Sequence, residues 1–169
     1  AIALCGKGNI GSSWLSLFAE QKAELEKRRG MNFELVAVVD SQTYWFDDQG
    51  IDATSVGKRF DDEAIANNGN DWLERLGSIQ GYDEAVVLDV TASPVLAAKY
   101  LQVAQQGIHL ISANKVAGSA SSEYYHQVQD AFAKISRHWL YNATVGAGLP
   151  INHTVRDLRE SGDDIIALS

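Results

Sequence analysis

The chain has 169 residues, which is enough for one domain with a hydrophobic core. An apolar fraction of 46% and a charged fraction of 21% are typical of a soluble globular protein, and no apolar run is long enough to span a membrane. The net charge of −8 without a basic stripe argues against a nucleic-acid partner. The single cysteine, Cys5, excludes an internal disulfide and is consistent with a reducing, cytoplasmic location. Because the chain opens on a strand without an initiator Met, we expect a piece of a longer polypeptide.

Strands and helices alternate along the chain. We expect a strand at Ile2–Cys5, a helix at Asn9–Arg29, a strand at Leu35–Val39, an irregular connection at 41–59 and a helix at 61–76. Further strands are expected at 84–90, 108–113 and 138–142, with helices at 94–107, 119–136 and 150–162 and the start of a strand at 164–169. This alternation predicts an α/β fold of the Rossmann type: a doubly wound, mostly parallel sheet with helices on both faces.

The first strand runs directly into Gly6-Lys7-Gly8-Asn9-Ile10-Gly11, and a helix follows at once. Such a motif also occurs by chance in loops, but between a strand and a helix it is typical of dinucleotide binding. Gly6 permits the tight turn, Gly8 allows a pyrophosphate to approach the backbone, and Gly11 lets the helix pack on the sheet. The helix N-terminus offers unpaired N–H groups to the phosphates.

Asp40 follows the second predicted strand, where an acidic residue typically binds the adenosine ribose hydroxyls. It lies 29 residues beyond Gly11, further than the roughly 20 usual for this motif, because the first helix is long. The alternative is a surface carboxylate in a turn.

Three later loops also follow predicted strands, at the edge of the sheet where ligands bind. Thr91 and Ser93 suit the middle of a dinucleotide, although Ser93 is also a good N-cap for a helix beginning at Pro94. Lys115 could direct its ammonium toward a substrate carbonyl or carboxylate, or be an ordinary exposed lysine. The glycine-rich segment 142–150 could bind a hard cation or be a simple strand-to-helix turn.

Together these segments resemble homoserine dehydrogenase, most closely the bifunctional aspartokinase/homoserine dehydrogenase enzymes of the methionine-linked type. The resemblance covers essentially the whole chain and is carried by the segments 6–11, 38–41, 89–93, 112–115 and 141–151. The run Ala-Thr-Val-Gly-Ala-Gly-Leu-Pro at 143–150 is much more specific than the glycine loop.

The resemblance implies reduction of L-aspartate 4-semialdehyde to L-homoserine with NADPH or NADH, on the route to threonine and methionine. By matching motifs, the pyrophosphate would be held by Gly8, Asn9, Ile10 and Gly11. Thr91 and Ser93 would lie near the ribose and nicotinamide, and Lys115 close to cofactor and substrate. The family's sodium ion would be bound by backbone carbonyls at Asn142, Val145, Ala147 and Leu149, although many members have Glu in place of Asn142.

The family's substrate carboxylates and proton-donating lysine lie in a following α+β domain, which also forms the dimer surface. We therefore expect residues 1–150 to be the cofactor-binding domain and residues 151–169 to begin the next one. The full-length protein is expected to be a homo-oligomer, and the chain alone to bind cofactor with little turnover.

Cofactor preference and function class both stay open. Asp40 favours NAD because a carboxylate repels a 2′-phosphate, whereas the family resemblance favours NADPH, and Lys58 or Arg59 could fold back to bind that phosphate. The alternative to an oxidoreductase is a regulatory module that binds NAD(H) without catalysis. A methyltransferase is disfavoured, because adenosylmethionine has no pyrophosphate for the glycine loop.

Overall fold

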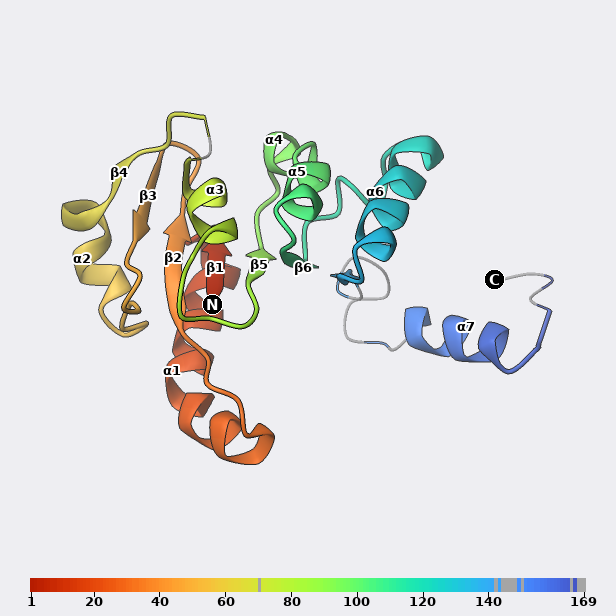
Figure 1. Cartoon of the computed structure of the whole chain (residues 1–169), viewed down its shortest axis with the longest axis horizontal. Helices are drawn as coiled ribbons and strands as arrows, with labels where there is room; N and C mark the ends of the chain where they lie inside the picture. Colours follow the sequence, from red (N-terminus) through yellow and green to blue (C-terminus); the bar gives the residue numbers. More distant parts are fainter. Residues whose placement is uncertain (70, 142, 144–148, 150, 165, 167–169) are drawn as a thin grey trace.

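The computed structural model describes residues 1–69, 71–141, 143, 149, 151–164 and 166. Within this part, seven strands form one sheet in the order β4-β3-β2-β1-β5-β6-β7 (Figure 1). The parallel strands are β1 (Ile2–Cys5), β2 (Leu35–Val39), β5 (Val86–Asp89), β6 (His109–Ser112) and β7 (Trp139–Leu140). Strand β3 (Thr43–Phe46) pairs antiparallel with β2, and β4 (Ile65–Ala66) pairs antiparallel with β3. The predicted mostly parallel α/β fold is confirmed.

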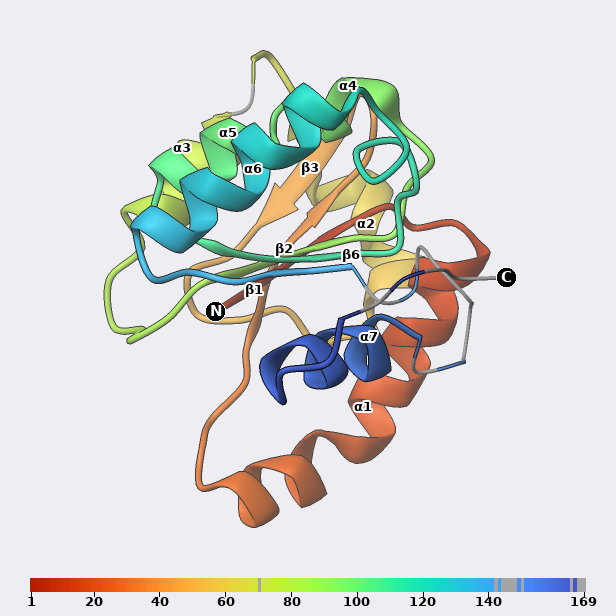
Figure 2. The same cartoon turned by 90° about the vertical axis from the view of Figure 1, so that its right-hand side faces the viewer.

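Helices cover both faces of the sheet (Figure 2). Helices α1 (Asn9–Arg29) and α2 (Val56–Glu63) lie on one face. Helices α3 (Asp71–Gly77), α5 (Tyr100–Gln105) and α6 (Ser122–Lys134) lie on the other. The short α4 (Pro94–Ala97) precedes α5, and α7 (Ile151–Glu160) lies beyond β7 (Figure 1). No helix in the described part of the chain is long and apolar enough to cross a membrane.

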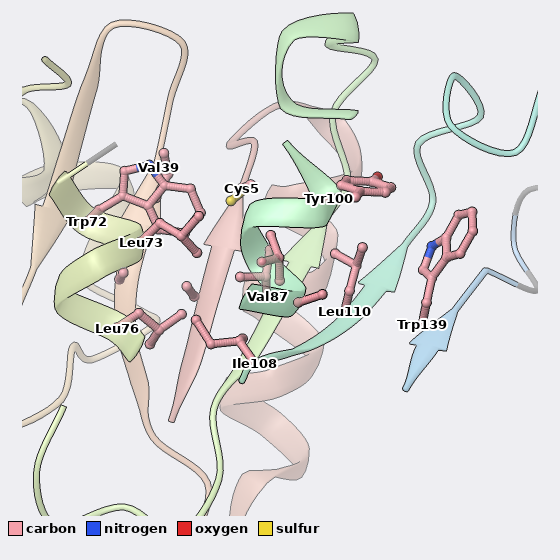
Figure 3. Close-up of a cluster of buried hydrophobic side chains, with 14 of the residues drawn as sticks. Cys5, Val39, Trp72, Leu73, Leu76, Val87, Tyr100, Ile108, Leu110 and Trp139 are labelled. Carbon is pink, nitrogen blue, oxygen red and sulfur yellow. The ribbon is translucent and has the colours of Figure 1, made fainter. Parts of the chain in front are cut away.

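Two hydrophobic cores, one on each face, hold these layers together. Trp72 and Leu76 of α3 and Tyr100 of α5 pack with Val87 and Leu110 of the sheet (Figure 3). The second core joins side chains of α1 and α2 to the opposite face: Leu4, Leu15, Phe18, Val38 and Phe60. Successive side chains of a strand point to opposite faces, so a strand buried on both faces is apolar throughout. All five residues of β2 are accordingly buried.

The expectations for residues 41–76 are wrong in two places. The stretch 41–59 is not irregular, because it contains β3 and the start of α2. Tyr44 and Trp45 are both 5% exposed and belong to the two different cores, which is the alternation of a strand. The single helix expected at 61–76 is two helices separated by β4, whose Ile65 is 57% exposed.

Other boundaries differ less. The helix expected at 94–107 divides into α4 and α5, and Gly107 follows with a φ of 72°, a conformation suited to glycine after a helix. Most of the strand expected at 164–169 lies outside the described residues.

Candidate functional site

A cleft of about 790 Å³ lies at the carboxyl ends of β1, β2 and β5. Strand β1 lies between β2 and β5, so the chain order reverses here, and open α/β sheets bind ligands at such a point. Five of the predicted site residues line this cleft together: Gly6, Gly8, Asp40, Thr91 and Ser93. The rest of the lining comes from Cys5, Lys7, Val39, Ser41, Asn67, Gly69, Trp72, Val90, Ala92, Val95, Leu96 and Lys99.

The three glycines of the first loop have different surroundings. Gly6 has a φ of 100°, which L side chains rarely adopt, and a Cβ on Gly11 would lie 2.0 Å from the carbonyl oxygen of Gly6. These two glycines are required by the fold itself. Gly8 is different, because it has a φ of −70° and a Cβ there would meet no atom within 4 Å. The space beside Gly8 is therefore open to a ligand.

The backbone amide groups after Gly8 provide hydrogen-bond donors beside this open space. Helix α1 begins at Asn9, and the amide of Ser12 donates to the carbonyl of Gly8 at 2.8 Å. The amides of Asn9, Ile10 and Gly11 precede this hydrogen bond and belong to the first helical turn, whose N–H groups have no intrahelical acceptor. Asn9 and Ile10 are exposed, and Gly11 is buried. The loop thus fits a diphosphate in its shape and in its donors.

Asp40 lies where β2 turns into β3. Its backbone amide donates to the carbonyl of Thr43 at 2.7 Å, and its carboxylate accepts from the amide of Ser41 at 2.6 Å. The ammonium of Lys7 lies 3.6 Å from the other carboxylate oxygen. Asp40 is therefore held at the edge of the cleft, as the predicted ribose-binding role requires.

A buried carboxylate, Asp89, supports the third loop. It is fully buried and accepts hydrogen bonds from the amide and hydroxyl of Thr91 at 2.8 and 2.7 Å. The hydroxyl of Tyr100 donates to it at 2.7 Å, and the side-chain amide of Asn114 at 3.0 Å. Burial, reinforced by the charge of Asp89, raises the pKa of Tyr100 far above its ordinary value, so Tyr100 stays a donor. A buried carboxylate without partners would be unstable, and here it has four donors.

Asn114 connects this network to the loop after β6. Its side-chain amide also donates to the carbonyl of Ser93 at 3.0 Å, and its oxygen accepts from the amide of Val116 at 3.0 Å. The hydroxyl of Ser93 accepts from the amide of Leu96 at 3.3 Å and caps α4, which confirms the N-cap interpretation.

No role was predicted from the sequence for Asp89, Tyr100 or Asn114. The available signal was the position of Asp89 at the end of an apolar strand, because a carboxylate buried there requires partners.

Two sets of predicted residues remain: Lys115, and the four residues expected to bind sodium. Lys115 is exposed at the end of β6 and does not belong to the cleft lining, and its carbonyl accepts from the amide of Ser119 at 3.0 Å. Of the four residues expected to bind sodium, Asn142, Val145 and Ala147 lie outside the described residues. The carbonyl of Leu149 accepts a hydrogen bond from the amide of Ile151 at 2.9 Å.

Known proteins resemble this chain along nearly all of its length. The family profile described as "Homoserine dehydrogenase, NAD binding domain" matches residues 6–142. The chain is 52% identical to bifunctional aspartokinase/homoserine dehydrogenase 2 of Escherichia coli, over 99% of this chain and 21% of that protein. It is 31% identical to a chloroplastic bifunctional aspartokinase/homoserine dehydrogenase 1 of Zea mays, over 99% of this chain and 18% of that protein. The chain thus spans about a fifth of the length of these relatives.

Solved structures show the same fold. A hyperthermophilic archaeal homoserine dehydrogenase in complex with NADPH superposes with a TM-score of 0.70 at 16% identity, covering 92% of this chain and 47% of that one. A homoserine dehydrogenase from Thermoplasma acidophilum gives 0.67 at 24% identity, covering 92% of this chain and 46% of that one. The profile match extends from the glycine loop through the end of β7, so this chain belongs to the homoserine dehydrogenase family and carries its NAD-binding domain.

Proposed function

We propose that this chain is the cofactor-binding part of an NAD(P)H-dependent homoserine dehydrogenase, which reduces L-aspartate 4-semialdehyde to L-homoserine. The observation that carries this proposal is the open face of Gly8 at the N-terminus of α1, in a cleft that also contains Asp40 and Thr91. The family match supports the proposed reaction class.

Each part of the cleft has its own task in this proposal. The amides of Gly8, Asn9, Ile10 and Gly11 bind the diphosphate, and Asp40 binds the adenosine ribose. The loop held by the Asp89 network presents Thr91 and Ser93 to the ribose on the nicotinamide side. When bound, the nicotinamide supplies a hydride to the aldehyde carbon.

Proton delivery to the developing alkoxide requires an acid in addition to the hydride. We propose that the acid comes from a following domain of the full-length protein, with Lys115 close to substrate and cofactor. The division at residues 150 and 151, the homo-oligomer and the cytoplasmic location also stay predictions. So does a sodium ion held by backbone carbonyls at Asn142, Val145, Ala147 and Leu149.

The test compares binding with turnover. NADPH and NADH are titrated into the chain, and NADPH oxidation is then followed with L-aspartate 4-semialdehyde for the chain and for the full-length bifunctional enzyme. We expect the chain to bind cofactor with little turnover, and the full-length enzyme to be active. Binding without turnover in the full-length enzyme would instead favour a regulatory NAD(H)-binding module.

A further inference from the structure

The second residue of the glycine loop, Lys7, lies at the ribose end of the cleft. Its ammonium is 3.6 Å from the carboxylate of Asp40 and 3.2 Å from that of Asp61 on α2. It also lies 3.9 Å from the centre of the Phe60 ring, within the range of a cation–π contact. The contacts with Asp61 and Phe60 hold the ammonium against α2, and from there it reaches the carboxylate of Asp40, the residue predicted to bind the adenosine ribose.

The two cations considered from the sequence lie elsewhere. Lys58 and Arg59 are exposed on α2, and neither belongs to the cleft lining. Arg59 forms an ion pair with Glu63 and lies 5.2 Å from the centre of the Trp45 ring. Lys99 does line the cleft, at the junction of α4 and α5, but the described part of the chain gives it no ion pair with Asp40.

We propose that Lys7 receives the 2′-phosphate of NADPH and, together with Asp40, sets the cofactor preference of this site. This inference rests on the proposed function, because it requires a nicotinamide dinucleotide in the cleft. A group on the 2′ position that reaches Asp40 also reaches the ammonium of Lys7, since the two side chains are in contact.

The charges explain why an acidic residue and NADPH are compatible here. Asp40 alone would repel a phosphate, but the adjacent ammonium offsets that repulsion and offers a charge-assisted donor. Because only about a third of the Lys7 side chain is exposed, at 35%, solvent screens this attraction less than it would for a free surface lysine. NADH needs only the carboxylate, which binds the ribose hydroxyl, so loss of the ammonium affects NADPH selectively.

The experiment measures the Kd of NADPH and of NADH for the chain at two salt concentrations. The central variant is Lys7→Met, which removes the charge but keeps an apolar side chain against Phe60. The matched control is Lys58→Met, an exposed lysine outside the cleft lining. Asp40→Asn is a second variant, which removes the negative charge of the pair and leaves the ammonium of Lys7 in place.

We expect the wild-type chain to bind NADPH at least as tightly as NADH at low salt. Lys7→Met should raise the Kd of NADPH by about tenfold or more, since a charge-assisted hydrogen bond is lost, and should change the Kd of NADH less than about threefold. It should also reduce the salt dependence of NADPH binding. Asp40→Asn should lower the Kd of NADPH and raise that of NADH, while Lys58→Met leaves both unchanged.

The proposal would be overturned if Lys7→Met raised the Kd of both cofactors equally while its unfolding by urea stayed the same as that of the wild type. It would also be overturned if Lys58→Met, or a further variant, Lys99→Met, raised the Kd of NADPH selectively, because the phosphate site would then lie elsewhere. If the wild-type chain binds neither cofactor, the proposed function itself fails. If it binds NADH alone, the proposed function stands, but the role of Lys7 in binding the 2′-phosphate is overturned.

Discussion

Replacement of Gly8 by alanine separates cofactor binding from folding. Gly8 has a negative φ, and a Cβ there meets no protein atom within 4 Å, so the fold accommodates the methyl group. As the N-cap of α1, alanine is poorer than glycine, and we expect the free energy of unfolding to fall by at most about 1 kcal/mol. The same methyl group fills the space where the diphosphate must approach the backbone.

Loss of one charge-assisted hydrogen bond to the diphosphate weakens binding by about 1.5–3 kcal/mol, which is at least tenfold in Kd. Urea denaturation and titration with NADPH or NADH measure the two effects on the same sample. The control is Gly57→Ala on α2, since a Cβ there also meets nothing within 4 Å and Gly57 lies outside the cleft lining. A Gly8→Ala chain that binds both cofactors as the wild type does would refute the diphosphate site.

Three further predictions concern the surrounding structure. Gly11→Ala should destabilise the fold itself, because its Cβ would lie 2.0 Å from the carbonyl oxygen of Gly6; a urea midpoint equal to that of the wild type would contradict this. Tyr100→Phe removes one donor from buried Asp89 and should lower the free energy of unfolding by about 1–3 kcal/mol, and a change below about 0.5 kcal/mol would show that the remaining donors suffice. Burial and an adjacent guanidinium lower the pKa of His109 below its ordinary 6.5, so the unfolded chain binds this proton more readily. The free energy of unfolding should therefore decrease as the pH falls from above 6.5 through the folded-state pKa, and His109→Gln should reduce that decrease in urea titrations at pH 7.5 and 5.5.

Local patterns predicted most of the fold. The strands Ile2–Cys5 and Leu35–Val39 and the helix Asn9–Arg29 have the predicted bounds, because apolar runs and the glycine loop mark them clearly. Residues 43–46 gave a weak signal, since a four-residue strand carries only two alternations and an aromatic stretch also suits a loop. Its pairing with β2 comes from tertiary contacts, which no local pattern contains.

The site shows the same division between local and long-range information. The position of two glycines, an acidic residue and a hydroxyl residue after predicted strands was sufficient to predict that Gly6, Gly8, Asp40 and Thr91 lie at one cleft. The Asp89 network was missed because two of its four donors, those of Tyr100 and Asn114, lie 11 and 25 residues along the chain and meet Asp89 only when the sheet and helices pack.

In the proposed complex, a nicotinamide dinucleotide lies with its diphosphate against the first turn of α1. The most direct measurement is a titration of the isotope-labelled chain with NADPH and with NADH, followed by the backbone amide resonances. We expect the largest shifts at the amides of Gly8, Asn9, Ile10 and Gly11. Saturable binding of either cofactor that leaves these four amides unshifted would contradict this expectation.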